Sequence, residues 1–130
     1  VEARQEFGLR VIHLGRAAVR TIGEELRKNG IVALVCDLPQ PPGVEVEFFG
    51  RKAMVPSGPG SLAIHHRAPV ITARVRMAGE GRYAVHVDPP LDLAGLDRQG
   101  IMQQVIRRFE TYIRESPEEW FAFKPLFQGG

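Results

Sequence analysis

Residues 48–63, FFGRKAMVPSGPGSLA, bring together residue types that could hold a substrate. The aromatic rings of Phe48 and Phe49 suit an apolar group, and the guanidinium of Arg51 suits a negatively charged one. A turn with almost no side chains follows and leads into an expected helix. The stretch therefore predicts either a structural turn or a site that holds an apolar group beside an anionic one.

The turn could bind an anion, because the start of a helix presents free backbone N–H groups and a partial positive charge. Gly58 and Gly60 would let a ligand approach that backbone, and the hydroxyl of Ser57 could donate a hydrogen bond to it. A plain capped turn is the competing interpretation. The letters also fit the weak dinucleotide-binding pattern G-x-G-x-x-A. We discount that pattern because Pro59 removes one N–H and no acidic residue follows at the expected spacing of about 20 residues.

Three acidic residues are candidates for contact with a substrate. Asp37 ends the apolar run 31–37, and ligands of open α/β sheets gather at the carboxyl ends of strands. An acid there could orient a base or accept a hydroxyl proton, or it could cap the proline-rich loop that follows. Glu45 and Glu47 share one face of an expected strand and could act as a pair, although this spacing is also typical of a solvated face.

The histidines and the remaining arginines predict no separate catalytic site. The four histidines do not have the spacing of metal ligands, so we expect no metal site. Arg74 and Arg76 share one face of an expected strand. They could bind phosphate or a membrane surface, or they could only keep an exposed strand soluble.

The elements that must position these residues alternate between strands and helices. Apolar runs and alternating patterns predict strands at 9–14, 31–37, 44–50, 69–76 and 82–90, the last two as a hairpin. Periodicity and proline placement predict helices at 16–30, 58–67 and 98–116, and a short helix after Ser116 as its cap. The fold class is therefore predicted to be α/β, with a mixed, mainly parallel sheet flanked by helices.

Length and charge restrict the kind of protein this can be. The 130 residues suit a single domain over residues 1–130 with one core. A formal net charge of +2 leaves room for a local basic face but lacks the excess of a nucleic-acid-binding protein, so we expect no nucleic-acid partner. No apolar run approaches the ~20 residues that span a bilayer. The chain does not begin with Met, so we expect it to be a piece of a longer protein.

Together these stretches resemble the bacterial lipid A biosynthesis acyltransferase family, which includes lauroyl and myristoyl transferases and the phosphatidylinositol mannoside acyltransferases of mycobacteria. The most specific match is FFG-x5-P-x-GP-x-x-LA followed by APV, at residues 48–70, and PEEW at 117–120 is next. The order and spacing of these motifs carry the resemblance, which covers essentially the whole chain. The pattern is closest to the phosphatidylinositol mannoside enzymes.

The resemblance implies a glycerolipid-acyltransferase-like fold at the cytoplasmic face of the cell membrane, peripheral or anchored by a segment outside this chain. Enzymes of the family move a fatty acyl group from an acyl carrier protein or coenzyme A thioester to a hydroxyl of a glycolipid. The thioester is a co-substrate, and we expect no cofactor.

The family's catalytic motif, His-x-x-x-x-Asp/Glu, does not occur in this sequence. The fifth residues after its four histidines are Ala18, Val70, Ile71 and Leu91. The resemblance therefore implies that the chain is the C-terminal portion of a larger acyltransferase domain, with the motif upstream. Such a piece is expected to be inactive alone.

The resemblance also implies roles for acidic and basic residues. Arg4 and Gly8 match the family's R-x-x-x-G, and Arg4 would hold the phosphate of a donor or acceptor. Asp37 matches a strand-end acid, and Glu47 stands where the phosphatidylinositol-type members carry an acid before FFG. The ending FAFKPLF departs from the family pattern, so it does not identify the acceptor.

For residues 48–60 the resemblance suggests what the apolar group and the anionic group would be. We expect Phe48 and Phe49 to pack along the acyl-chain groove. Arg51 and the turn at residues 57–60 would then meet the polar end of a substrate. The alternative function is a non-catalytic lipid- or phosphate-binding module that retains the fold.

Overall fold

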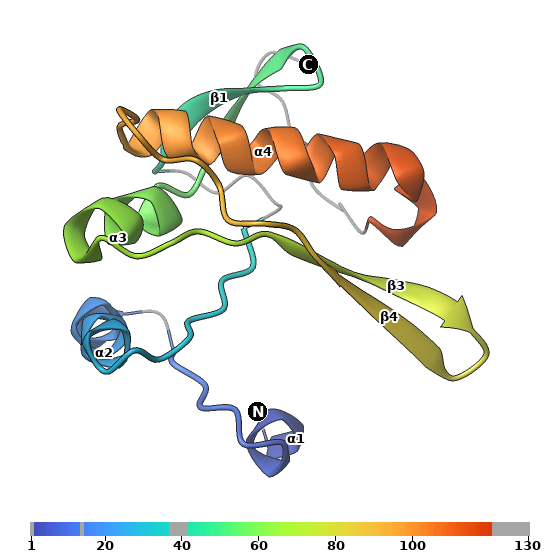
Figure 1. The fold of residues 1–130 in the computed structure, drawn as a ribbon, viewed down its shortest axis with the longest axis horizontal. Helices are drawn as coiled ribbons and strands as arrows, with labels where there is room; N and C mark the ends of the chain where they lie inside the picture. Colours follow the sequence, from blue (N-terminus) through green and yellow to red (C-terminus); the bar gives the residue numbers. More distant parts are fainter. Residues whose placement is uncertain (1, 14, 37–41, 121–130) are drawn as a thin grey trace. The chain divides into compact units, whose positions relative to one another are not determined.

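The computed structural model describes residues 2–13, 15–36 and 42–120, and the chain divides into two units, residues 1–33 and 34–130 (Figure 1). The first unit contains helices α1 (Glu2–Glu6) and α2 (Arg16–Arg27). After α2, Asn29 has a φ of 61° and the N–H of Gly30 donates to the carbonyl of Glu25 at 2.8 Å. The helix predicted for 16–30 is therefore confirmed, and it stops at Asn29-Gly30.

The second unit is built on helix α4 (Arg98–Glu115). Asp97 caps its start, since its Oδ1 accepts the N–H of Gly100 at 2.8 Å. Two adjacent pairs of apolar residues, four positions apart, are buried along one face: Ile101 with Met102, and Val105 with Ile106. The amphipathic helix predicted for 98–116 is confirmed, and this buried face organises the core.

Strands β1 (Val44–Phe48) and β2 (Arg51–Val55) form an antiparallel hairpin that packs against α4. Side chains of β1 alternate between the core and solvent, as the sequence predicted. The core joins apolar residues of the hairpin, of α4 and of the preceding segment: Cys36, Val44, Val46, Phe48, Ala53, Val55, Met102, Val105 and Ile106.

Two glutamines of α4 bind the edge of β1 that faces away from β2. Gln99 Nε2 donates to the carbonyl of Glu45 at 3.0 Å. Gln103 both accepts the N–H of Glu47 and donates to its carbonyl, each at 2.8 Å. Their amides thereby satisfy backbone groups that a neighbouring strand would otherwise bind.

Helix α3 (Gly58–His66) packs on α4, and a second antiparallel hairpin follows it, with strands β3 (Ala73–Gly79) and β4 (Arg82–Val87). A single turn of 3₁₀ helix, η1 (Pro117–Glu119), ends the described chain. Ser116 stands at the N-cap position of η1, as predicted, but its side chain makes no capping bond.

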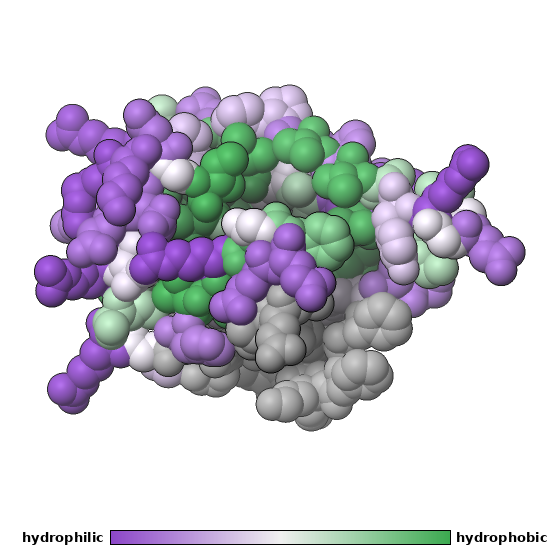
Figure 2. Space-filling model, turned by 90° about the horizontal axis from the view of Figure 1, so that it is seen from below, coloured by the Kyte–Doolittle hydropathy of each residue, from purple (hydrophilic) through white to green (hydrophobic). Residues whose placement is uncertain are grey.

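The β3–β4 hairpin exposes an apolar face. Its register pairs Val75 with Val85 and Met77 with Tyr83, and all four side chains are exposed. Arg74 and Arg76 lie at the alternate positions, on the opposite face. Figure 2 shows hydrophobic side chains at the surface beside hydrophilic ones.

The prediction of a chain that mixes helices and strands is confirmed, but both sheets of the described chain are antiparallel. The predicted, mainly parallel sheet is absent from this part of the chain, because residues 9–13 and 31–36 form no strand. A parallel strand needs a neighbouring strand and cover on both faces. Val35, at 94% exposed, has no such cover.

Candidate functional site

The FFG motif forms the turn of the β1–β2 hairpin. Phe48 pairs with Arg51, and the residues between them, Phe49 and Gly50, have φ values of 51° and 75°. Positive φ at both central residues is what a two-residue type I′ turn requires. Glycine adopts this conformation without strain, whereas for phenylalanine it costs about 1–2 kcal/mol. Other contacts must therefore hold Phe49 in place.

The two aromatic rings of the motif have different surroundings. Phe48 is fully buried, and its ring centroid lies 5.0 Å from that of Phe49 and 5.7 Å from that of Trp120, on which it stacks. Phe49 is half-buried, with the guanidinium carbon of Arg114 5.1 Å from its ring centre. The structure thus gives Phe48 a place in the core, and the acyl groove along this pair stays a prediction.

A buried carboxylate from α4 holds the turn. Glu110 is 3% exposed, and its Oε1 accepts the N–H of Phe49 at 2.9 Å. Two arginines compensate its charge: Arg107 Nη1 lies 3.4 Å from Oε1, and Arg114 Nη2 lies 3.9 Å from Oε2. A buried charge without such partners would be strongly destabilising, so these contacts belong together.

Arg107 connects the buried Glu110 to the exposed Glu47. Its Nη2 lies 3.3 Å from Oε1 of Glu47, while its Nη1 faces Glu110. The hydrogen bond that Arg107 donates to Glu47 raises the pKa of Arg107. The negative charges of Glu110 and Glu47 raise it further, while the loss of hydration lowers it. The guanidinium therefore stays charged and fixes the position of the Glu47 carboxylate.

The glycine-rich turn starts α3, as predicted. Ser57 precedes the helix without a side-chain capping bond, and Gly58 is exposed with open space around its Cα. Gly60 is buried, and a Cβ there would lie 2.7 Å from the carbonyl oxygen of Arg98. Gly60 thus allows α3 to approach the start of α4, a packing role that the sequence reasoning missed.

The remaining predicted site residues are Arg4, Arg51 and Asp37. Arg4 lies in α1 of the first unit and is exposed. Arg51 is exposed at the start of β2. Asp37 lies outside the described residues. The structure therefore brings together Glu47, Phe48, Arg51 and the turn between β1 and β2.

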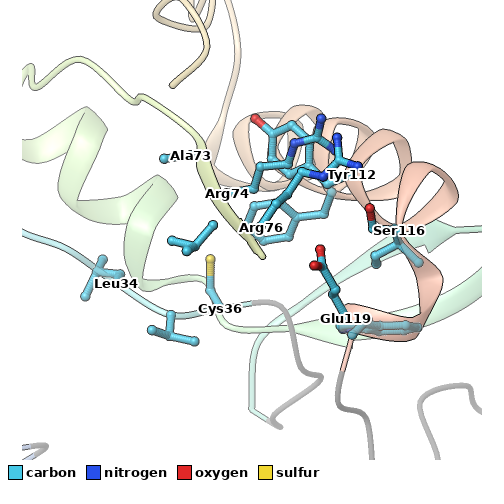
Figure 3. A pocket seen from close by; sticks show the side chains of 13 residues that line it. Leu34, Cys36, Ala73, Arg74, Arg76, Tyr112, Ser116 and Glu119 are labelled. Carbon is cyan, nitrogen blue, oxygen red and sulfur yellow. The ribbon is translucent and has the colours of Figure 1, made fainter. Parts of the chain in front are cut away.

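A cavity of about 400 Å³ opens in the second unit (Figure 3). Residues of the segment before β1, of β3, of α4 and of the η1 region line it, most of them apolar; Leu34, Cys36, Phe109, Ile113 and Trp120 are examples. Arg74, Arg76 and Glu119 bring charge to its wall. The cavity thus combines an apolar lining with a basic strand.

A polar network that includes Tyr112 of the cavity lining ties α4 to the segments around the β3–β4 hairpin. The Tyr112 hydroxyl donates to Asp88 and lies 2.7 Å from Thr72 Oγ1, and Arg108 donates to Thr72 at 3.2 Å. Burial, and then the Asp88 bond, raise the pKa of Tyr112. The hydrogen bond from Tyr112 lowers the pKa of Asp88. The loss of hydration raises it by less, and the nearby His86 lowers it further. The network therefore keeps a neutral phenol beside an ionised carboxylate.

Glu110 and Arg107 are the residues that sequence reasoning missed. A signal was present: Met102, Ile106 and Glu110 follow one another at intervals of four on the buried face of α4. A carboxylate in such a row must find a partner inside the fold. The sequence alone could not identify that partner.

Two kinds of feature are absent from the described residues. Residues 2–13, 15–36 and 42–120 contain no group of three or more His, Cys, Asp or Glu that could hold a metal ion. In the same ranges, none of the helices has both the length and the apolar character needed to cross a membrane.

Comparison with known proteins extends over almost the whole chain. Residues 1–129 match the family model described as bacterial lipid A biosynthesis acyltransferase. A phosphatidylinositol mannoside acyltransferase of Mycobacterium tuberculosis strain H37Rv is 32% identical, over 96% of this chain and 40% of its own length. One from Mycolicibacterium smegmatis is also 32% identical, over 96% of this chain and 42% of its own length. The chain thus spans about two fifths of these relatives. Because the family model matches nearly every residue, the chain belongs to the bacterial lipid A biosynthesis acyltransferase family.

Proposed function

We propose that the full-length protein containing this chain is an acyltransferase. It moves a fatty acyl group from an acyl carrier protein or coenzyme A thioester to a hydroxyl of a glycolipid of the phosphatidylinositol mannoside or lipid A type. The family match over residues 1–129 carries the proposal. The names of the mycobacterial relatives favour a phosphatidylinositol mannoside as the acceptor.

In this proposal the chain is the C-terminal portion of the acyltransferase domain. The catalytic His-x-x-x-x-Asp/Glu lies upstream of Val1, where the histidine takes the proton of the acceptor hydroxyl and the carboxylate orients the histidine. The thioester supplies the acyl group, so no cofactor is needed. The apolar run 31–36 joins a mixed, mainly parallel sheet when the upstream portion is present.

The residues of this chain supply substrate contacts rather than the proton transfer. Glu47 accepts hydrogen bonds from hydroxyls of the acceptor, because its side chain is 56% exposed while Arg107 holds one of its oxygens. Arg4, Arg51 and the start of α3 bind phosphate groups. The protein works at the cytoplasmic face of the membrane, where its glycolipid acceptor resides.

The test starts with the coding sequence upstream of Val1. We expect a His-x-x-x-x-Asp/Glu some thirty residues before Arg4. The full-length protein should then transfer label from a radiolabelled long-chain acyl coenzyme A, or from the acyl carrier protein thioester, to phosphatidylinositol mannoside. Replacing the motif histidine by alanine should abolish the transfer.

The opposite results separate the two candidate functions. If no such motif precedes Val1, or if neither donor gives acylated product, the acyltransferase proposal is wrong. The non-catalytic module would then be favoured, and binding of phosphatidylinositol mannoside vesicles would be the measurement to make. Residues 1–130 alone should be inactive in the same assay.

A further inference from the structure

We propose that Glu110 and Arg107 of α4 are positioning residues for the carboxylate of Glu47. The inference deepens the proposed function and rests on it, because Glu47 is the residue proposed to contact the acceptor. Neither α4 residue touches the substrate in this view. Both act through Glu47.

The first step is the backbone on either side of Glu47. Gln103 makes two hydrogen bonds of 2.8 Å to the N–H and carbonyl of Glu47 itself. Two residues later, Oε1 of Glu110 accepts the N–H of Phe49 at 2.9 Å. Helix α4 therefore binds the end of β1 at both points and fixes the direction in which the Glu47 side chain leaves the strand.

The second step is the turn that follows. Phe49 has a φ of 51°, which a phenylalanine adopts only when its surroundings hold it. Glu110 is buried and supplies the acceptor for its N–H. Without Glu110, the N–H of Phe49 would lose its acceptor. The turn could then relax away from positive φ, and Glu47 would be displaced.

The third step is the side chain of Glu47. One guanidinium, that of Arg107, lies 3.4 Å from Oε1 of Glu110 and 3.3 Å from Oε1 of Glu47. Because Glu110 is only 4% exposed at its side chain, it anchors the guanidinium from the inside. The exposed carboxylate is therefore held before a ligand arrives, which lowers the entropy lost on binding.

The chemistry of the held group indicates its ligand class. A carboxylate accepts hydrogen bonds and donates none, so it recognises hydroxyl groups such as those of a sugar ring. Glu47 remains 56% exposed at its side chain, which leaves room for such a contact beside Arg107. The pair Glu110–Arg107 should therefore affect binding of the sugar-containing acceptor and leave binding of the acyl donor unchanged.

The test compares two arginine variants of the full-length protein in the acyl transfer assay with phosphatidylinositol mannoside. Arg107→Met removes the link to Glu47. Arg114→Met is the matched control, because Arg114 also pairs with Glu110 but makes no ion pair with Glu47. We expect Arg107→Met to raise the acceptor KM about three- to five-fold, the size of an exposed ion pair, with kcat and donor KM within about two-fold. Arg114→Met should leave all three within about two-fold of wild type.

Further variants exclude a purely structural role. Glu110→Gln keeps an oxygen for the N–H of Phe49 but loses the charge, so it should raise the acceptor KM while Glu110→Ala also lowers the melting temperature. In a double-mutant cycle, Arg107→Met should hardly raise the acceptor KM further once Glu47→Gln is present, because Arg107 acts through Glu47. Arg107→Lys, which keeps the charge, should recover part of the acceptor KM.

The outcomes distinguish this inference from the proposed function. If wild type transfers acyl groups but Arg107→Met leaves the acceptor KM unchanged, the positioning role is wrong and the function stands. Equal rises in donor and acceptor KM, or additive effects with Glu47→Gln, would also overturn it. If wild type transfers no acyl group from either donor, the proposed function fails and the inference fails with it.

Discussion

Phe48 is the largest fully buried side chain among the described residues, and its ring stacks on that of Trp120 and contacts the tilted ring of Phe49. We expect Phe48→Ala to lower the free energy of unfolding by about 3–5 kcal/mol, because it removes buried apolar surface and leaves a cavity. Urea unfolding measures the change. The matched control is Tyr83→Ala, an aromatic that is 69% exposed on β4 and should cost less than about 1 kcal/mol. Similar losses for both variants would contradict the core position of Phe48.

Asp88 should make stability depend on pH. Its pKa lies below the ordinary value of 3.8, chiefly because Tyr112 donates to the ionised form. A lowered folded-state pKa contributes stability above the unfolded pKa, and this contribution is lost as the pH falls through the folded value. The stability gap between wild type and Asp88→Asn should therefore shrink as the pH falls below 3.8.

Chemical unfolding at a series of pH values measures that gap. Tyr112→Phe removes the same hydrogen bond and should flatten the acid dependence in the same way. A gap that stays constant from neutral pH to about pH 3 would show that the Asp88 contact does not depend on its charge.

At the residue scale, the sequence predicts which residues could contact a substrate but not which residues hold them in position. The FFG motif and Glu47 stand out by residue type alone. The partners of Phe49 and Glu47 lie 61 and 60 residues further along the chain, in α4. A partner at that separation is set by the packing of a helix on a hairpin, which no local pattern contains.

At the scale of elements, the approach of α3 to α4 depends on Gly60. A methyl group there would lie 2.7 Å from the carbonyl oxygen and 3.1 Å from the Cα of Arg98, and backbone atoms cannot move aside cheaply. We expect Gly60→Ala to lower the free energy of unfolding by about 1–3 kcal/mol. Gly58→Ala, with nothing within 4 Å, is the control and should be neutral or slightly stabilising.

Thermal or urea unfolding of the two variants provides the measurement. If Gly58→Ala destabilised as much as Gly60→Ala, the effect would come from the turn and not from the contact between helices. Equal losses would therefore contradict the packing role of Gly60.

The elements also show which sequence signals are reliable. Helices α2, α3 and α4 were predicted because periodicity and end signals are local properties of a segment. The β1–β2 and β3–β4 hairpins lie within stretches predicted as strands, since each strand has its partner close by in the sequence. The strands predicted at 9–14 and 31–37 are wrong where the structure describes them, at 9–13 and 31–36. An apolar run becomes a strand only beside another strand.

At the scale of the whole molecule, the apolar face of the β3–β4 hairpin should govern how residues 1–130 behave in isolation. Val75, Met77, Tyr83 and Val85 are each at least 60% exposed. Exposed apolar patches of this kind promote association. We expect the isolated chain to bind the dye ANS and to sediment as species larger than a monomer at high concentration.

The double variant Val75→Thr and Val85→Thr should reduce both signals, because it makes the centre of this face polar while retaining β-branched side chains. Arg76→Thr, on the opposite face of the same hairpin, is the control and should change neither. If the double variant bound as much dye as the parent chain, the dye-binding surface would not be this face of the β3–β4 hairpin.

The contact between Phe48 and Trp120 has an optical consequence. Trp120 is the one tryptophan of the sequence, and its indole N–H is buried with no hydrogen-bond acceptor among the described residues. Selective excitation of Trp120 therefore reports on one place, where its ring stacks on Phe48 of the FFG hairpin. Detachment of the segment after α4 would shift the emission to longer wavelength even while the helices stayed folded. The chain thus carries its own fluorophore, and release of its end can be followed without a label.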